Sequence, residues 1–325
     1  MNICFLDGVD IPYTSNDSKC SKLRGAENVV INLSKELFRL GHKITVFNNV
    51  HKNTIINGVI WRNINNIDQN TNFDLAISNN DLNLFKKIKS KKYLAISHSI
   101  QSIEKFIRKK QLFSYLKYRP KIILLSSYHS DNRNKLLKIF GSINLQWAVD
   151  EDFLDTVIDD NLVEKRALFT SRNDRNLNLL INLWKNKIYS KDKLSKLYVT
   201  PSPLIDNKFN IFERNFGKRL FLINDLKKSK VFLVPGHKGE IFCLAAEEAR
   251  ELCVPIVTLG IGSLSERVHH GVTGFIAKNQ NEFADFALNI LNDNNLWQKL
   301  RNNLINIRGS KTWQMIAKKL IENVK

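Results

Sequence analysis

The chain has 325 residues, and its 50 lysines and arginines outnumber 31 aspartates and glutamates, which gives a formal net charge of +19. A hydrophobic fraction of 43% and a mean hydropathy of −0.26 are typical of a globular protein, and the length favours two domains. No run of about 18 apolar residues is present, so no transmembrane helix is expected. The opening residues lack the basic and long apolar regions of a signal peptide, so we expect a cytoplasmic protein.

The first 150 residues alternate between predicted strands and helices. A buried strand at 2–9 and a polar loop precede a helix at 26–41, in which apolar residues recur at helical spacing and Gly41 marks the end. Further strands are predicted at 42–49, 73–78, 92–97 and 121–127. Strand–helix–strand units build parallel sheets, so a Rossmann-like domain is expected here.

Between these strands lies a strongly basic segment. Residues 86–121 hold 12 basic residues against one acidic residue, Glu104, and so contribute +11 to the net charge. Residues 102–118 read as one helix with apolar side chains along a single face, namely Ile103, Phe106, Ile107, Phe113 and Leu116.

A basic amphipathic helix suits an anionic membrane surface, so 101–121 is a candidate for peripheral docking on the inner face of a membrane. The alternative is a helix that packs on the core and exposes a solvated basic face. No helix-turn-helix, zinc-finger or RNA-binding signature is present, so we expect no nucleic acid as a partner.

The second half repeats the alternation. Strands are predicted at 167–171, 196–201, 230–235 and 255–260, and helices at 176–188, 241–252, 282–292 and 311–325. Residues 220–229 fit either a strand and turn or a short helix. The fold class is therefore α/β, with two Rossmann-like doubly wound domains that face each other across a cleft. An acidic stretch within 150–165 is the expected boundary.

The strongest chemical signal lies at 231–276. A strand ends at Pro235, and a short loop precedes a helix that we expect to begin near Glu240, where free backbone N–H groups suit phosphate or sugar oxygens. On one helix, Glu240 and Glu248 would lie about 12 Å apart. This is too far for a paired acid/base couple but suits two hydroxyl-rich parts of one extended ligand. A solvated Glu248 is the alternative.

This segment resembles the C-terminal half of the family-four (group 1) glycosyltransferases, which have the GT-B fold. Their usual pattern is a strand, Pro, E-x-F-x-L-x-x-x-E-A, a Pro-initiated strand, a glycine loop, E-x-V and H-G-x-x-G. The residues in register are Glu240, Phe242, Leu244, Glu248, Ala249, Pro255, Gly260, Gly262, Glu266, Val268, His270, Gly271 and Gly274. The resemblance implies an acceptor-binding domain at 1–155, a nucleotide-sugar-binding domain at 156–308, and a helix at 309–325 that crosses back to the first domain.

The resemblance also implies roles for these residues. Glu240 would act in catalysis and contact the donor sugar near its anomeric carbon. The backbone at Phe242, Cys243 and Leu244 would lie near the sugar and the diphosphate. Glu248 would accept hydrogen bonds from the ribose hydroxyls.

A second match, 169–184, resembles the first strand and helix of the family's C-terminal domain. The usual form has an Arg and then a Lys followed by Gly, and the two cations hold the diphosphate. Here Arg172 and Arg175 are the available cations, and Asn176 stands where Gly is usual. Both are expected to bind the donor, and Arg175 to stabilise the departing diphosphate during catalysis.

The N-terminal half matches the family more loosely. In the stretch 23–47, Gly25 would approach the donor, while Arg24 replaces the first glycine of the usual pair. His98 follows the predicted strand at 92–97, where the family often has a histidine near the donor sugar, so it is a catalytic candidate. A buried structural histidine is the alternative at this position.

The expected function is transfer of a hexosyl group from a nucleotide-sugar donor to a hydroxyl of a glycan or lipid-linked acceptor, in surface polysaccharide or glycolipid synthesis. The family retains the anomeric configuration and needs neither a cofactor nor a metal. The four cysteines form no metal-ligand spacing, and no metal site is expected. Two alternatives stay open: a nucleotide-sugar epimerase of the same fold, and a non-catalytic nucleotide-sugar-binding protein, because Arg24, Trp147 and Asn176 depart from the pattern.

Overall fold

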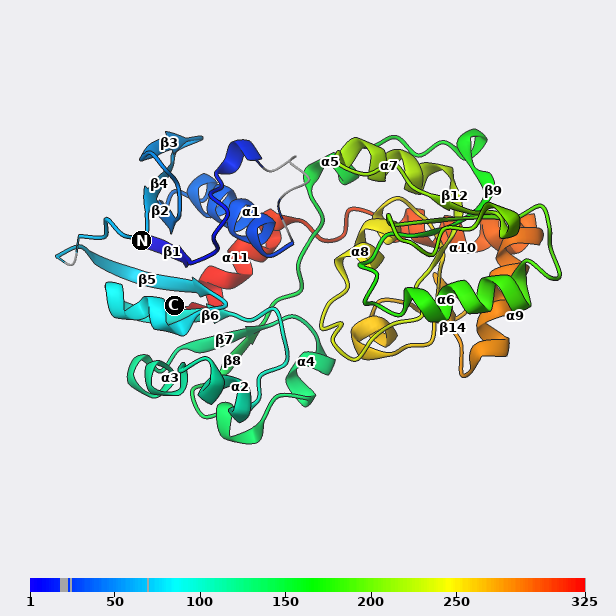
Figure 1. Cartoon of the computed structure of the whole chain (residues 1–325). Coiled ribbons are helices and arrows are strands. Elements are labelled where there is room, and N and C mark those ends of the chain that lie inside the picture. Colours follow the sequence, from blue (N-terminus) through cyan, green and yellow to red (C-terminus); the bar gives the residue numbers. More distant parts are fainter. Residues whose placement is uncertain (18–22, 24, 69, 325) are drawn as a thin grey trace. The chain divides into compact units, whose positions relative to one another are not determined.

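The computed structural model describes residues 1–17, 23, 25–68 and 70–324, so that Arg24 lies outside the described residues. Internal contacts divide the chain into two compact units (Figure 1). The N-terminal unit comprises 1–148 together with 312–325, and the C-terminal unit comprises 149–311. The sequence-based boundary at 155/156 therefore falls inside the C-terminal unit.

The N-terminal unit is built on an eight-stranded sheet with the order β3-β4-β2-β1-β5-β6-β7-β8. Its strands are β1 (Asn2–Asp7), β2 (Lys43–Asn48), β3 (Thr54–Ile56), β4 (Val59–Asn63), β5 (Asn72–Asn79), β6 (Lys89–Ile96), β7 (Lys121–Leu124) and β8 (Ser142–Asn144). All neighbours pair in parallel except β3 and β4. Because the strands are parallel, the carboxyl ends of β1, β5 and β6 lie at one edge of the sheet.

The helices of this unit are α1 (Gly25–Arg39), α2 (Ile103–Arg108), α3 (Leu112–Tyr118), α4 (Ser127–Asp131) and α11 (Trp313–Val324), with short 3-10 turns at Ser15–Asp17, Leu82–Lys87 and Lys135–Leu137. The C-terminal helix α11 lies against α1 (Figure 1). Its first residue, Trp313, stacks on Trp147 with ring centroids 5.6 Å apart. Trp147 therefore has a packing role inside this unit.

The C-terminal unit is built on a six-stranded parallel sheet with the order β11-β10-β9-β12-β13-β14. Its strands are β9 (Glu164–Phe169), β10 (Lys196–Val199), β11 (Ile211–Glu213), β12 (Ser229–Leu233), β13 (Ile256–Thr258) and β14 (Gly274–Ile276). Its helical segments are α5 (Glu151–Leu154), α6 (Leu177–Leu183), a π-helical turn (Trp184–Ile188), α7 (Arg219–Lys228), α8 (Leu244–Glu251), α9 (Gln280–Asn292) and α10 (Asn294–Ile307), with 3-10 turns at Asp160–Leu162, Asn207–Phe209 and Gly262–Glu266.

Both faces of this second sheet are buried. Side chains alternate along a strand, so Ala167 and Phe169 enter one apolar core with α6, α9 and α10, while Leu168 enters another with α5, α7 and α8. This is why the predicted strands read as continuous apolar runs. The doubly wound pattern expected from the sequence is confirmed for this unit.

The predicted single helix at 102–118 is wrong. The chain forms α2 and α3, separated by Lys110 in the left-handed region with φ of 53°. The amide of Lys110 donates to the Ile107 carbonyl and the amide of Gln111 to the Phe106 carbonyl, which is the Schellman helix end, here built without glycine. Apolar spacing continues across the break, and the sequence pattern therefore did not reveal it.

The structure also contains elements that the sequence analysis did not predict. The most prominent are the hairpin of β3 and β4 and the long helix α10. The hairpin turns at Asn57 and Gly58, whose φ angles of 50° and 79° fit an Asn-Gly type I′ turn. In the part of the chain that the structure describes, no helix is long and apolar enough to cross a membrane.

Candidate active site

Two loops at the carboxyl end of the second sheet carry most of the predicted residues. The first joins β9 to α6 and contains Arg172, Arg175 and Asn176. Asn176 has φ of 63° and its side-chain amide donates to the backbone carbonyl of Gly236 in the second loop. Asparagine tolerates this left-handed conformation better than other residues with a Cβ, which explains how it occupies a position where the family usually has glycine.

The second loop joins β12 to α8 and contains His237 and Glu240. The Glu240 amide donates to the His237 carbonyl at 2.9 Å. Gly262 approaches this turn so closely that a Cβ there would lie 2.6 Å from the His237 oxygen and 2.7 Å from the Glu240 oxygen. Gly262 is thus required for the loop geometry, because its φ of 75° and this close approach both exclude a side chain.

Arg175 joins the two loops. Its Nε lies 3.0 Å from Oε1 of Glu240, and its Nη1 donates to Nδ1 of His237 at 2.8 Å. The same Nδ1 accepts the Gly239 amide at 2.9 Å, so this ring nitrogen carries no proton in this arrangement. The side chains of Arg175 and Glu240 are 19% and 14% exposed, which places the ion pair in a partly desolvated position open to a ligand.

The pKa of Glu240 is raised. Burial is the main cause, and the charges of Arg175 and His237 oppose it. A raised carboxyl pKa beside a cation is typical of functional positions, although structural ion pairs share this property.

Arg172 lies differently from Arg175. Its side chain is 71% exposed and pairs with Asp174, with Nε to Oδ1 at 3.0 Å and Nη2 to Oδ2 at 2.5 Å. Of the two arginines, Arg172 is the more exposed to solvent and makes fewer contacts with the two loops. Of the two predicted diphosphate cations, only Arg175 contacts Glu240.

The expectation that a helix begins near Glu240 is wrong. The helix α8 begins at Leu244, and its N-cap residue Cys243 has φ of 59°. Glu240 therefore lies in the loop, and only Glu248 lies on the helix. Phe242 and Cys243 are buried and Leu244 is half-buried. Burial raises the pKa of the Cys243 thiol well above its ordinary value.

Glu248 is half-buried on α8. Among the described residues its carboxyl group has no hydrogen-bond partner. Burial is the main cause that raises its pKa to about 8; the nearby charge of Asp150 acts in the same direction, and Arg219 and Arg214 oppose the rise. Arg219 itself pairs with Asp150 at 2.5 Å. The sequence analysis gave no role to Asp150, Arg214 or Arg219, which lie at the N-cap of α5, directly after β11 and at the first residue of α7.

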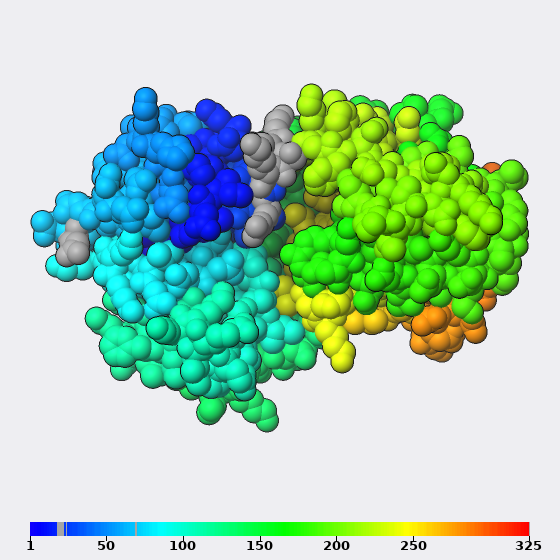
Figure 2. Space-filling view, viewed as in Figure 1, coloured from blue at the N-terminus to red at the C-terminus, as the bar shows by residue number. Residues whose placement is uncertain are grey.

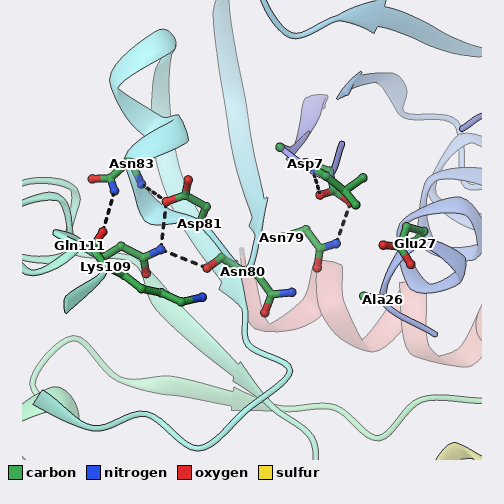
Figure 3. Close-up of a pocket in the computed structure, with 11 residues that line it drawn as sticks. Asp7, Ala26, Glu27, Asn79, Asn80, Asp81, Asn83, Lys109 and Gln111 are labelled. Carbon is green, nitrogen blue, oxygen red and sulfur yellow. Dashed lines mark hydrogen bonds between the residues drawn. The ribbon is translucent and has the colours of Figure 1, made fainter. Parts of the chain in front are cut away.

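The predicted residues of the N-terminal unit lie at the carboxyl edge of its sheet. Nε2 of His98 lies 2.9 Å from Oδ1 of Asn79, and its backbone amide donates to Asn80. Burial, aided by His129, lowers the pKa of His98 to about 4, so the ring is neutral at pH 7. Gly25 is the exposed first residue of α1. No sequence motif pointed to Asn79, which also donates to the buried carboxylate of Asp7 at 2.8 Å (Figure 3).

A match to a known protein family covers the second of the two loops. Residues 217–307, which include Glu240 and Glu248, match the family described as glycosyl transferases group 1. This part of the chain is therefore similar to the group 1 glycosyltransferases. A search of curated proteins finds no match.

Solved glycosyltransferases share the fold of the whole chain. Anabaena HepE, crystallised with UDP and glucose, has a TM-score of 0.73 at 14% identity, covering 100% of this chain and 99% of its own. Sucrose-phosphate synthase from Thermosynechococcus elongatus has a TM-score of 0.72 at 13% identity, covering 99% and 98%. WaaG, a glycosyltransferase of lipopolysaccharide biosynthesis, has a TM-score of 0.68 at 12% identity, covering 99% of each chain.

The structural matches confirm the predicted GT-B fold, and the family match supports the predicted resemblance to the group 1 glycosyltransferases over 217–307. They do not assign roles to single residues of this chain, so the roles of Arg175, Glu240, Glu248 and His98 stay predictions. Among the described residues, no three His, Cys, Asp or Glu side chains are grouped so that they could hold a metal ion.

Proposed function

We propose that this glycosyltransferase moves a hexosyl group from a nucleoside diphosphate sugar to a hydroxyl group of a glycan or lipid-linked acceptor. The contact between Arg175 and Glu240 carries the proposal, because it joins a cation and a carboxylate at the carboxyl ends of β9 and β12. This is where open parallel sheets bind ligands.

Each side chain would have a distinct task. Arg175 would bind the diphosphate, whose negative charge grows as the bond to the anomeric carbon breaks. Glu240 would accept hydrogen bonds from hydroxyls of the donor sugar and, as the partner of Arg175, keep that guanidinium in place. Glu248 would accept hydrogen bonds from the ribose hydroxyls of the nucleotide. We further propose that the reaction retains the anomeric configuration, and that Arg172 and Arg175 compensate the charge of the diphosphate in place of a divalent metal.

The choice of donor follows the structural relatives. HepE was crystallised with UDP-glucose and with UDP and glucose. These complexes support UDP-glucose as the first donor to test, and WaaG supports a surface glycolipid as the first acceptor class.

The test compares Arg175→Ala and Glu240→Ala with the wild type in an assay of UDP release and glycoside formation. Loss of a preorganised contact to developing charge lowers kcat by about 10²- to 10³-fold. The matched controls are Arg62→Ala and Glu322→Ala, which remove exposed side chains of the N-terminal unit. Transfer near the wild-type rate in both site variants would refute the site assignment, and an isomerised donor without transfer would favour an epimerase.

We also infer that the enzyme works at the inner face of an anionic membrane. The basic segment leaves three large apolar side chains exposed: Ile107 at 58%, Phe113 at 66% and Leu116 at 50%. Basic residues that are also exposed surround them, namely Arg108, Lys109, Lys110 and Lys117. Apolar side chains among cations are typical of an interfacial membrane contact.

A further inference from the structure

The guanidinium group of Arg175 is held at two of its nitrogen atoms. Its Nε lies 3.0 Å from Oε1 of Glu240, and its Nη1 donates to Nδ1 of His237 at 2.8 Å. A single acceptor would let the planar group turn, whereas two acceptors on different nitrogens fix its plane. A guanidinium has five N–H donors, so this arrangement still leaves donors for a ligand.

His237 is itself held by the loop in which it lies. Its carbonyl accepts the Glu240 amide at 2.9 Å, and the carbonyl of the preceding Gly236 accepts the side-chain amide of Asn176. Its Nδ1 also accepts the Gly239 amide at 2.9 Å. This last contact resembles the Asx turn, in which an Asn or Asp oxygen accepts a backbone amide two residues further along the chain. The loop therefore sets the position of the ring before any ligand binds.

Gly239 leaves the space in which the two side chains meet. A Cβ at this position would lie 2.6 Å from Nη1 of Arg175 and 3.0 Å from Nδ1 of His237. Any residue other than glycine would therefore displace one of these two groups. The short loop between β12 and α8 thus supplies both the acceptor for Arg175 and the room that the contact needs.

The acceptor at His237 carries no negative charge. Arg175 already pairs with the carboxylate of Glu240. Asp174, whose Oδ1 lies 3.8 Å from Nε of Arg175, is exposed and pairs with Arg172. A further carboxylate in the place of His237 would give Arg175 and its two acceptors a formal charge of −1, which would repel a diphosphate. An imidazole nitrogen orients the guanidinium without adding this charge.

We propose that His237 is a positioning residue, which holds the guanidinium of Arg175 by an uncharged acceptor and so leaves its positive charge available to the diphosphate of the donor. The inference rests on the proposed function, in which Arg175 binds that diphosphate. His237 acts through Arg175, and its effect on the donor depends on the presence of that guanidinium.

The test measures the binding of UDP to the full-length protein by calorimetry. Three variants are compared with the wild type: His237→Ala, His237→Asn and His237→Asp. The last two place an oxygen near the position of Nδ1, where it can accept the Gly239 amide and preserve the turn, and they differ from each other in charge. The matched control is His51→Ala, which removes an exposed histidine of the N-terminal unit.

We expect His237→Ala to weaken UDP binding about tenfold, the usual effect of losing a hydrogen bond to a charged group. His237→Asp should weaken it at least as much, whereas His237→Asn should bind UDP more tightly than either. In an Arg175→Ala background, His237→Ala should cause no further loss, because no guanidinium is left to position. Equal UDP binding by the Asn and Asp variants, or additive losses in the double variant, would overturn the inference.

A second measurement needs no nucleotide. The Nε–H resonance of Arg175 in the ligand-free protein, assigned by its loss in Arg175→Ala, should shift and exchange faster with water in His237→Ala. An unmoved resonance in a protein that transfers sugar would refute only the role of His237. A shifted resonance in a protein whose UDP binding does not depend on Arg175 would refute the proposed function and leave the contact in place.

Discussion

The environment of Glu248 favours a protonated carboxyl group, whereas its expected role as an acceptor of hydrogen bonds needs the ionised form. It is half-buried, and burial together with Asp150 raises its pKa to about 8. In the ligand-free protein at pH 7 it is therefore mostly protonated. A donor whose ribose hydroxyls bond to its carboxylate would favour the ionised form, so nucleotide binding would release a proton near neutral pH.

This pKa predicts a pH-dependent stability. Glutamate in the unfolded chain has a pKa of about 4.3, so between about pH 5 and pH 8 the folded state holds one more proton than the unfolded state. Raising the pH across this window therefore lowers the free energy of unfolding, by at most about 1.4 kcal/mol per pH unit. Urea unfolding of the wild type and Glu248→Gln should show the wild type losing stability relative to the variant as the pH rises.

Glu322→Gln, an exposed glutamate of α11, serves as the control and should follow the wild type at every pH. Parallel curves for the wild type and Glu248→Gln would contradict the raised pKa.

Residue types at the candidate site were partly predictable from sequence. Glu240 and Arg175 were selected from motifs, and the structure brings them within 3.0 Å. The contact of His237 with Arg175 and that of Asn79 with His98 were not predicted, because a hydrogen bond between residues far apart in the chain leaves no local pattern. Asn176 read as a departure from the family, yet its left-handed φ of 63° gives the backbone conformation that glycine would adopt.

At the scale of elements, a buried charge cluster joins three parts of the C-terminal unit. Oδ1 of Asp225, on α7, accepts a hydrogen bond from Nη2 of Arg166, on β9, at 2.5 Å. Its Oδ2 accepts one from Nε of Arg214, the residue after β11, at 3.2 Å. All three side chains are buried, and Arg166 also stacks on Tyr198 with its guanidinium 3.8 Å from the ring centroid. Asp225 thus compensates two buried cations.

Asp225→Asn should therefore destabilise the fold. Removing one partner of a buried charge pair costs about 3–5 kcal/mol, because the remaining charge is left without compensation. Thermal or urea unfolding should show this loss. As a comparison, Asp285→Asn on α9 breaks an exposed ion pair with Lys191. This change should lower the free energy of unfolding by less than about 1 kcal/mol. Equal losses in the two variants would show that the cluster is not the stabilising feature described.

The elements themselves were predicted unevenly. The central strands were found because parallel strands buried on both faces are continuous apolar runs. The break between α2 and α3 and the late start of α8 were missed, since each depends on a residue other than glycine in the left-handed region, Lys110 and Cys243. The hairpin at 54–63 was missed although Asn57-Gly58 is a strong turn signal, because both flanking strands are short.

At the scale of the whole molecule, the positive charge and the exposed apolar side chains coincide. Residues 133–140 pack against α3, where the Tyr115 hydroxyl donates to the Leu137 carbonyl, and they expose Leu136 at 70% and Ile139 at 62%. Together with α2 and α3 they belong to one part of the surface of the N-terminal unit, coloured from cyan to green in Figure 2. Lys135 and Lys138 are also exposed there, which extends the basic apolar surface beyond the predicted 101–121.

This surface predicts binding to anionic vesicles. The variant reverses three exposed charges, Arg108→Glu, Lys110→Glu and Lys117→Glu. Each basic residue near an anionic surface contributes about 1 kcal/mol, so each reversal should lower partitioning at least about fivefold.

Co-sedimentation with phosphatidylglycerol-containing vesicles at low salt measures the effect, and high salt should weaken wild-type binding in the same direction. The control reverses three exposed lysines elsewhere, Lys196, Lys299 and Lys318, and so changes the net charge equally. If the control loses binding as much as the variant, net charge alone attracts the protein. If neither variant differs from the wild type, the basic face is only solvated. Loss confined to the first variant assigns the contact to α2 and α3, because only the position of the charges then differs.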